Sequence, residues 1–233
     1  MPELTSTEFW VAVLQIIAID IILSGDNAVV IALACRNLPP AQRRLGIAWG
    51  VAGAVGLRVV LTAFAASLLG YPYLKVVGGV LLMWIGVKLI LPDDDNGHHE
   101  IKAATHLWGA VRTIILADFI MSLDNVIAVA AASRGSVFLL IFGLAVSIPL
   151  IVWASQIIMK LMERFPVVIV LGAGLLGWVA GGMMVSDVAV KSSVSAWFPG
   201  AGLAASACGA VLVVATGRWL AMRKERTKDY TVV

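Results

Sequence analysis

The sequence predicts an all-α membrane protein with about seven transmembrane helices, and three observations support this fold class. The chain has 233 residues, of which 61% are hydrophobic and only 13% are charged, whereas an average soluble domain carries about 25% charged residues. The mean hydropathy is +0.97. Apolar runs long enough to cross the roughly 30 Å hydrocarbon core of a bilayer recur along the chain. A water-soluble fold is therefore excluded.

Seven apolar runs can be placed in order along the chain. They are expected at about residues 9–34, 45–69, 71–91, 107–132, 136–159, 165–185 and 199–220. A polar segment separates the third run from the fourth, and it contains Asp93, Asp94, Asp95, His98, His99 and Glu100. Such a linker is usually only solvated, and collecting cations is the alternative role. Cys35 and Cys208 lie apart from each other and from any histidine, so they indicate neither a disulfide nor a thiolate metal site.

The distribution of Lys and Arg predicts the orientation, because cytoplasmic loops of membrane proteins are enriched in these residues. One side of the predicted layout receives Lys75, Arg134 and Lys191. The other side receives Arg36, Arg43, Arg44, Lys88, Lys102, Arg112, Lys160, Arg164, Arg218, Arg223, Lys224, Arg226 and Lys228. We therefore expect the amino terminus outside and the carboxy terminus in the cytoplasm. Membrane topology also explains the net charge of +3 better than nucleic-acid binding does.

The first and fourth runs share a polar motif, Asp-x3-Ser-x-Asp-Asn. The first copy consists of Asp20, Ser24, Asp26 and Asn27, and the second consists of Asp118, Ser122, Asp124 and Asn125. The third and sixth runs also match, since Pro72, Gly78, Leu81, Leu82 and Trp84 correspond to Pro166, Gly172, Leu175, Leu176 and Trp178. These matches predict an internal repeat.

The repeat predicts how the chain is organised. We expect a first three-helix repeat over residues 1–91, a polar cytoplasmic linker over 92–106, a second three-helix repeat over 107–187, and a seventh helix with a basic cytoplasmic tail over 188–233. Because each repeat contains an odd number of spans, the two repeats would have opposite orientations, as in many secondary transporters. The two motifs would then face each other near the middle of the membrane. Glycine pairs such as Gly177 and Gly181 would allow close helix packing.

The two motifs would bury four carboxylates, and each costs at least about 2.5 kcal/mol at the centre of a bilayer. On a regular helix the first Asp, the Ser and the Asn of each motif share one face, while Asp26 and Asp124 point about 120° away. Unwinding near Gly25 would change this geometry in the first copy, and Leu123 makes unwinding less expected in the second. Arg58 is expected to pair with one of the aspartates, with a role in gating as the alternative. Asp187 and Lys88 are expected to reach water.

The oxygen atoms of these side chains form a hard site suited to Mn²⁺, Ca²⁺ or Mg²⁺. Two other interpretations of the motifs remain. The polar groups could bond one another and hold helices together, or the buried aspartates could relay protons without a metal.

The two motifs, the stretch GGVLLMWIGVKL at residues 78–89 and the seven-run layout resemble the TerC family of integral membrane proteins, within the wider LysE-type exporter superfamily. The resemblance covers nearly the whole chain. Members of the family are associated with manganese efflux and homeostasis in bacteria. The resemblance implies a multi-pass protein of the bacterial inner (plasma) membrane, and metal binding at Asp20, Asp26, Asn27, Asp118, Asp124 and Asn125. Ser24, Ser122 and Arg58 are secondary candidates.

The leading hypothesis is a secondary transporter that exports a divalent metal cation, foremost Mn²⁺, by alternating access around a midplane Asp/Asn site. The alternatives are export of another cation such as Ca²⁺, export of an organic solute such as an amino acid, and a non-transporting membrane partner that helps to metallate exported proteins. The sequence has no P-loop pattern, and we expect neither enzyme activity nor a cofactor, although residue types alone leave an intramembrane aspartyl hydrolase open. The expected partners are the cation and the lipid bilayer. Nucleic acid is not expected, and a homo-oligomer is left open.

Overall fold

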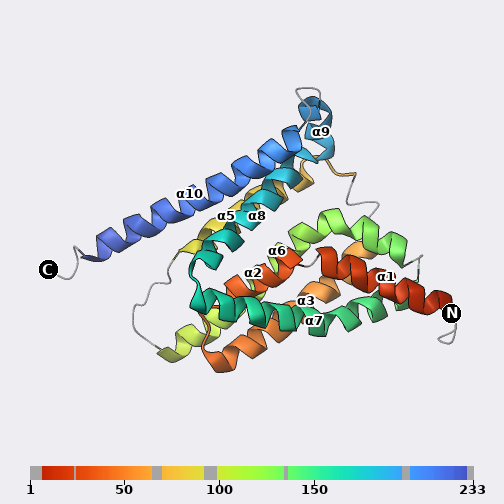
Figure 1. The fold of residues 1–233 in the computed structure, drawn as a ribbon, viewed down its shortest axis with the longest axis horizontal. Helices are drawn as coiled ribbons and strands as arrows, with labels where there is room; N and C mark the ends of the chain where they lie inside the picture. The colour runs from red at the N-terminus through yellow and green to blue at the C-terminus, as the bar shows by residue number, and fades with distance from the viewer. Residues whose placement is uncertain are drawn as a thin grey trace. The chain divides into compact units, whose positions relative to one another are not determined.

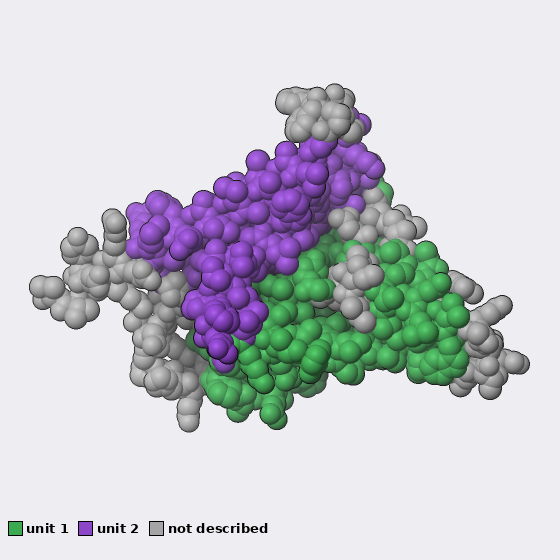
Figure 2. All heavy atoms as spheres, viewed as in Figure 1, with its two compact units in different colours: residues 1–70, 100–160 green, residues 71–99, 161–233 purple. Residues whose placement is uncertain are grey.

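The computed structural model describes residues 7–23, 25–64, 70–91, 99–133, 136–195 and 200–229. All regular secondary structure in these ranges is helical, which confirms the predicted all-α class. The chain divides into two compact units (Figure 2). Unit 1 comprises residues 1–70 and 100–160, and unit 2 comprises residues 71–99 and 161–233.

Unit 1 contains the helices that carry the two acidic motifs (Figure 1). Its elements are α1 (Thr7–Leu23), α2 (Gly25–Cys35), α3 (Pro40–Ala63) and most of α6 (His99–Ala132) and α7 (Val137–Arg164). Helix α3 begins at a proline, which suits a first helical position because the N–H that proline lacks would have no partner there. Pro149 lies inside α7, where it removes one backbone hydrogen bond from the helix.

The first predicted run forms two helices rather than one. Helix α1 ends at Leu23, α2 begins at Gly25, and the axes of the pair are bent by 53°. In the second motif, α6 continues through the corresponding residues without interruption. The structure thus adopts the alternative that the sequence left open, a break beside Gly25 in the first motif and a continuous helix through Leu123 in the second.

Among the described residues, five helices are long and apolar enough to cross a membrane, and the bent pair α1–α2 raises this number to six if it counts as one span. Helix α5 (Leu74–Ile90), in the third predicted run, has 17 residues. At 1.5 Å per residue it is about 26 Å long, slightly shorter than the hydrocarbon core of roughly 30 Å. The protein is thus a multi-pass helical membrane protein, while the count of seven spans and the inverted arrangement stay predictions.

The outer surfaces of both units carry large apolar side chains. Trp49 and Trp153 in unit 1 are 64% and 66% exposed, and Leu203 and Val211 in unit 2 are each 68% exposed. Exposed apolar patches are uncommon on soluble monomers and mark contact with a membrane or a partner. These positions therefore agree with helices that face lipid.

Unit 2 is built around three closely packed helices, α5, α8 (Val167–Val185) and α10 (Ala201–Asp229), with the short α9 (Val188–Ser195) after α8 (Figure 1). A Cβ atom added to Gly177 or Gly181 would run into the backbone carbonyl of Gly209 or Ala205, respectively. Only glycine allows α8 and α10 to approach this closely. The close packing expected for the glycine pair of α8 is therefore confirmed.

The two units do not follow the boundaries of the predicted repeats. Unit 1 contains the two motif-bearing segments, α1–α2 and α6, whereas unit 2 contains α5 and α8, which carry the second set of sequence matches. Each pair of matching segments is thus found in the same unit. The repeat boundaries and the opposite orientation of the repeats remain predictions from the sequence.

Asp187, between α8 and α9, is a buried carboxylate rather than a surface group. It is 0% exposed, so the expectation that it reaches water was wrong. Its oxygens accept backbone N–H hydrogen bonds from Tyr73 and Lys75, both at 2.9 Å, and from Ala189 at 2.8 Å. Burial raises the pKa of this carboxyl group, but the backbone donors outweigh burial, so its pKa lies below the ordinary value.

Candidate functional site

A single arginine lies at the centre of the polar interior of unit 1. Arg58 is on α3 and is 3% exposed. Its Nη1 and Nη2 atoms form ion pairs with carboxylate oxygens of Asp20 on α1 and Asp118 on α6, respectively. The expected pairing of Arg58 with an aspartate is confirmed, and it involves two aspartates, one from each motif. A planar guanidinium with two parallel donor groups is well suited to such a bridge.

The second carboxylate oxygen of Asp20 binds a serine that belongs to neither motif. Its Oδ1 atom is bound by Arg58, and its Oδ2 atom accepts a hydrogen bond from the hydroxyl of Ser147 on α7. Asp20 is 1% exposed. Because an unpaired buried carboxylate is costly, the arginine and the serine together explain how α1 tolerates this charge.

Asp118 is held by its own motif. Its Oδ1 atom is bound by Arg58, and its Oδ2 atom accepts a hydrogen bond at 3.2 Å from Ser122, one turn further along α6. Ser122 also accepts a hydrogen bond from Nε of Arg58 at 3.1 Å. The shared helix face predicted for Asp118 and Ser122 therefore places both side chains against the same arginine.

The remaining motif residues are placed as follows. Asn27 is 5% exposed, and Asp26 and Asn125 are partly buried. The carboxylate of Asp26 accepts the backbone N–H of Asn27 at 2.9 Å, and Asp26 lies in the first turn of α2, where a negative charge is favourable. Ser24 and the side chain of Asp124 lie outside the described part of the chain, as do residues 92–98 of the predicted polar linker, whereas residues 99–106 form the start of α6.

A cavity of about 10 Å³ adjoins the ion pairs. It is lined by Asn27, Val30, Ile31, Ala54, Ile114 and Asp118. A volume of this size is near the lower limit for one water molecule. One polar residue from each motif therefore borders the same small space.

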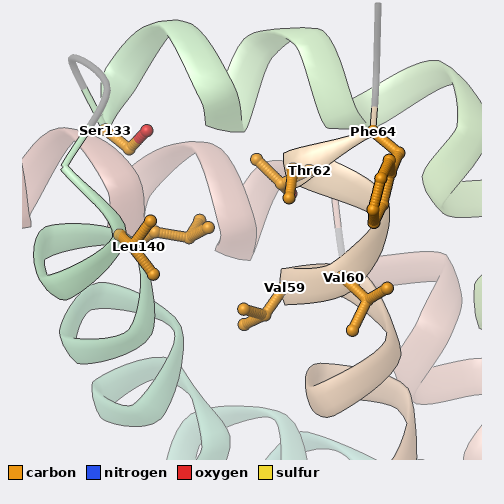
Figure 3. Close-up of a pocket in the computed structure, with 8 residues that line it drawn as sticks. Val59, Val60, Thr62, Phe64, Ser133 and Leu140 are labelled. Carbon is orange, nitrogen blue, oxygen red and sulfur yellow. The ribbon is translucent and has the colours of Figure 1, made fainter. Parts of the chain in front are cut away.

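A larger pocket of about 370 Å³ lies further along α3, beyond Arg58 (Figure 3). Val59 and Thr62 from α3 and Leu140 from α7 line it, and the hydroxyl of Thr62 donates to the backbone carbonyl of Arg58 at 2.7 Å. Leu140 and Val59 also belong to an aliphatic cluster that includes Val129, Leu144, Ile19 and Val55. Since Ile19 precedes Asp20 and Leu144 lies one turn before Ser147, this cluster connects the pocket wall with the ion pairs.

Ser147 is the partner that sequence reasoning missed. It lies in an apolar run without a charge or a repeated motif, and isolated serines are common in membrane helices. Ser155, on the same helix, shows the ordinary case, because its hydroxyl bonds the carbonyl of Val152 in its own helix, and the Ser147 hydroxyl likewise lies 2.8 Å from the carbonyl of Leu144. Only the spatial contact with Asp20 distinguishes Ser147.

The ion pairs use carboxylates that could otherwise bind a metal. Within the ranges that the structure describes, no group of three or more His, Cys, Asp or Glu side chains is gathered as a metal site. The oxygens of Asp20 and Asp118 are instead engaged by Arg58 and the two serines. The chemistry of the donors nevertheless remains that of a hard-cation site.

These features define a multi-pass helical membrane protein with a buried, charged centre. The chain belongs to the TerC family of integral membrane proteins, whose family model matches residues 5–226.

Two relatives illustrate the breadth of this similarity. The chain is 47% identical to the uncharacterized membrane protein YjbE of Bacillus subtilis (strain 168), over 77% of this chain and 82% of that protein. It is 26% identical to the UPF0053 inner membrane protein YgdQ of Escherichia coli (strain K12), over 74% of this chain and 79% of that protein. No solved structure matches the chain.

Proposed function

We propose that the protein is a secondary transporter that exports a divalent metal cation, with Mn²⁺ as the cargo. One observation carries this proposal: Asp20 and Asp118, which occupy the same position in the two repeated motifs, both bind the guanidinium of Arg58 inside unit 1. One residue from each copy of the acidic motif thus binds the same positively charged side chain. A buried position able to hold positive charge is what a cation transporter requires.

The donor set favours a hard cation over an amino acid. The proposed ligands are the carboxylates of Asp20, Asp26, Asp118 and Asp124 and the carboxamides of Asn27 and Asn125, which are the oxygen donors that Mn²⁺, Mg²⁺ and Ca²⁺ prefer. Membership of the TerC family supports manganese as the particular cargo, because some members are associated with manganese efflux.

In the proposed mechanism the cargo binds where the two motifs meet, and the inverted repeats alternate its access between the two sides. The pocket beyond Arg58 is the candidate entrance, because its wall is continuous with the aliphatic cluster beside Asp20. An apolar constriction can close such a path by excluding water. The proposed orientation has the carboxy terminus in the cytoplasm and rests on the distribution of Lys and Arg.

Transport by the purified protein in liposomes tests the proposal. Proteoliposomes loaded with Mn²⁺ should release it faster than protein-free liposomes with the same Mn²⁺ load. Asp118→Asn should slow release by about tenfold or more, in line with the loss of a residue that supports a metal site. Glu163→Gln is the matched control, since it removes the same charge from an exposed position at the end of α7.

The outcomes separate the candidate functions. Wild-type release of Mn²⁺, lost in Asp118→Asn and kept in Glu163→Gln, supports the transporter. Release of an amino acid but not of Mn²⁺ would favour the organic-solute exporter. A folded protein that releases neither would contradict transport and favour a non-transporting membrane partner.

A further inference from the structure

The carboxylate oxygens of the two motif aspartates are already occupied by groups of the protein itself. For Asp20, Arg58 binds Oδ1 and Ser147 binds Oδ2. For Asp118, Arg58 binds Oδ1 and Ser122 binds Oδ2. A cation that coordinates both aspartates would therefore have to take positions that the guanidinium holds in this structure.

The charges of these three side chains also indicate that a bound cation would displace the guanidinium. Two carboxylates face one guanidinium, so the group carries one net negative charge. A divalent cation added while Arg58 stays would make the net charge positive in a buried place, where screening is weak. A divalent cation that replaces the guanidinium would neutralise the two carboxylates. For the group formed by Asp20, Asp118 and Arg58, exchange therefore balances the charge better than simultaneous binding does.

The space around the aspartates leads to the same conclusion. The cavity between Asn27 and Asp118 is about 10 Å³, and Asp20 does not line it. A cation placed there would reach Asp118 but not Asp20. Access to both carboxylates requires the guanidinium to move aside, and the long side chain of arginine has the rotatable bonds for this.

We propose that Arg58 is a tethered competitor of the cargo: its guanidinium and the exported divalent cation occupy Asp20 and Asp118 in turn. This inference rests on the proposed transport function. The arrangement in the structure is then the cargo-free carrier, in which Arg58 compensates the carboxylates while the empty protein returns to its loading state. Competition from Arg58 also keeps the cargo from binding too tightly to be released.

The test compares Arg58→Gln, Arg58→Lys and the wild type, each as the full chain in liposomes. Equilibrium Mn²⁺ binding is measured from the electron paramagnetic resonance signal of unbound Mn²⁺. Arg58→Gln should bind Mn²⁺ about tenfold more tightly than the wild type, because a competing positive charge is gone. Arg58→Lys should fall between the two, since an ammonium keeps the charge but lacks the fork that bridges two carboxylates. A merely structural role would weaken binding instead.

Two transport rates provide a second measurement. Net release of Mn²⁺ requires the empty carrier to return, whereas exchange of internal Mn²⁺ for external radioactive Mn²⁺ does not. Net release by Arg58→Gln should therefore fall by a larger factor than exchange. Arg112→Gln is the matched control, because it removes the same charge from an exposed position on α6, and it should keep wild-type affinity and rates.

The results distinguish this inference from the function on which it rests. A wild type that transports Mn²⁺, with variants that bind it no more tightly or lose release and exchange equally, would overturn the role of Arg58 alone. If Arg58→Gln does not fold, Arg58→Lys decides, since an affinity equal to or below that of the wild type would contradict competition. A wild type that moves no Mn²⁺ would overturn the proposed function and this inference together.

Discussion

The two units solve the problem of a buried carboxylate in different ways. In unit 1, Asp20 and Asp118 are held by side chains: one arginine and two serine hydroxyls. In unit 2, Asp187 is held by backbone N–H groups of Tyr73, Lys75 and Ala189. All three aspartates are at most 6% exposed, so burial alone does not tell them apart.

The difference lies in whether the partner can leave. Backbone donors are fixed by the start of α5 and α9, and they can move only if those helices move. The guanidinium of Arg58 is at the end of a flexible side chain, and in the proposed exchange another cation takes its place. We therefore interpret Asp187 as a structural connection within unit 2 and the Asp20–Arg58–Asp118 group as a site for a mobile cation.

The largest effect on stability is expected for Arg58→Leu. This change leaves two buried carboxylates without their cation, and breaking a buried ion pair from one side costs about 3–5 kcal/mol. Asp20→Asn should cost less, because one carboxylate and the guanidinium remain as a neutral pair. Thermal unfolding in detergent measures both, with Arg112→Gln as the surface control. Equal destabilisation by Arg58→Leu and Asp20→Asn would contradict the account of charge balance.

A smaller effect is expected for Asp187→Ala, which leaves backbone donors of α5 and α9 without their acceptor. The expected loss is about 2 kcal/mol, within the range for buried groups that lose a partner. Ser186→Ala is a neighbouring control, since the Ser186 hydroxyl donates to the backbone carbonyl of Met183 at the end of α8. It should change the unfolding temperature little.

The effect of Asp187 should also depend on pH in a defined direction. Its pKa in the folded protein lies below the ordinary value of 3.8, so the ionised carboxylate stabilises the fold. This contribution is fully present above the ordinary pKa and is lost as the pH falls through the lower folded-state pKa. The stability difference between the wild type and Asp187→Ala should therefore be constant near neutral pH and shrink below about pH 4. A difference that grows on acidification would mean that the carboxyl is held protonated.

The smallest effect is expected for Ser147→Ala, which removes one hydrogen bond to Asp20 and costs about 1 kcal/mol. Ser155→Ala is the matched control on the same helix, because the Ser155 hydroxyl bonds a carbonyl of its own helix. Thermal unfolding should separate the two variants. If both shift the unfolding temperature equally, the contact between Ser147 and Asp20 contributes nothing beyond an ordinary helix serine.

Much of the fold could be predicted from the sequence because the membrane imposes simple rules. Apolar length predicted the long helices, and Gly25 allowed for the break in the first motif that α6 lacks in the second. Gly177 and Gly181 indicated that α8 packs closely against a neighbour, and the structure identifies this neighbour as α10. The grouping of the helices into two units could not be predicted, because it depends on which membrane-spanning helices pack together. The apolar faces of these helices are too similar in sequence to identify their partners.

Residue type and spacing could identify residues of the site, but not the contacts between them. The repeated motif identified Asp20 and Asp118, and the isolated charge of Arg58 indicated an acidic partner. The sequence could not show that one arginine bridges both copies, because this depends on how α1, α3 and α6 meet. Ser147 and the burial of Asp187 were missed for the same reason. Asp20 is distant in sequence from Ser147, and Tyr73 and Lys75 are distant from Asp187, which they bind through backbone groups that carry no sequence signal.

The most direct test of the central claim is a structure of the full chain soaked with Mn²⁺ and measured at the manganese absorption edge. The account predicts an anomalous peak within about 2.0–2.6 Å of oxygens from both Asp20 and Asp118, the range of Mg²⁺ and Ca²⁺ ligand distances, with the guanidinium of Arg58 moved away from at least one of them. A saturating soak that leaves Arg58 bound to both aspartates, with the manganese peak elsewhere or absent, would contradict the claim that these two motif carboxylates form the cargo site.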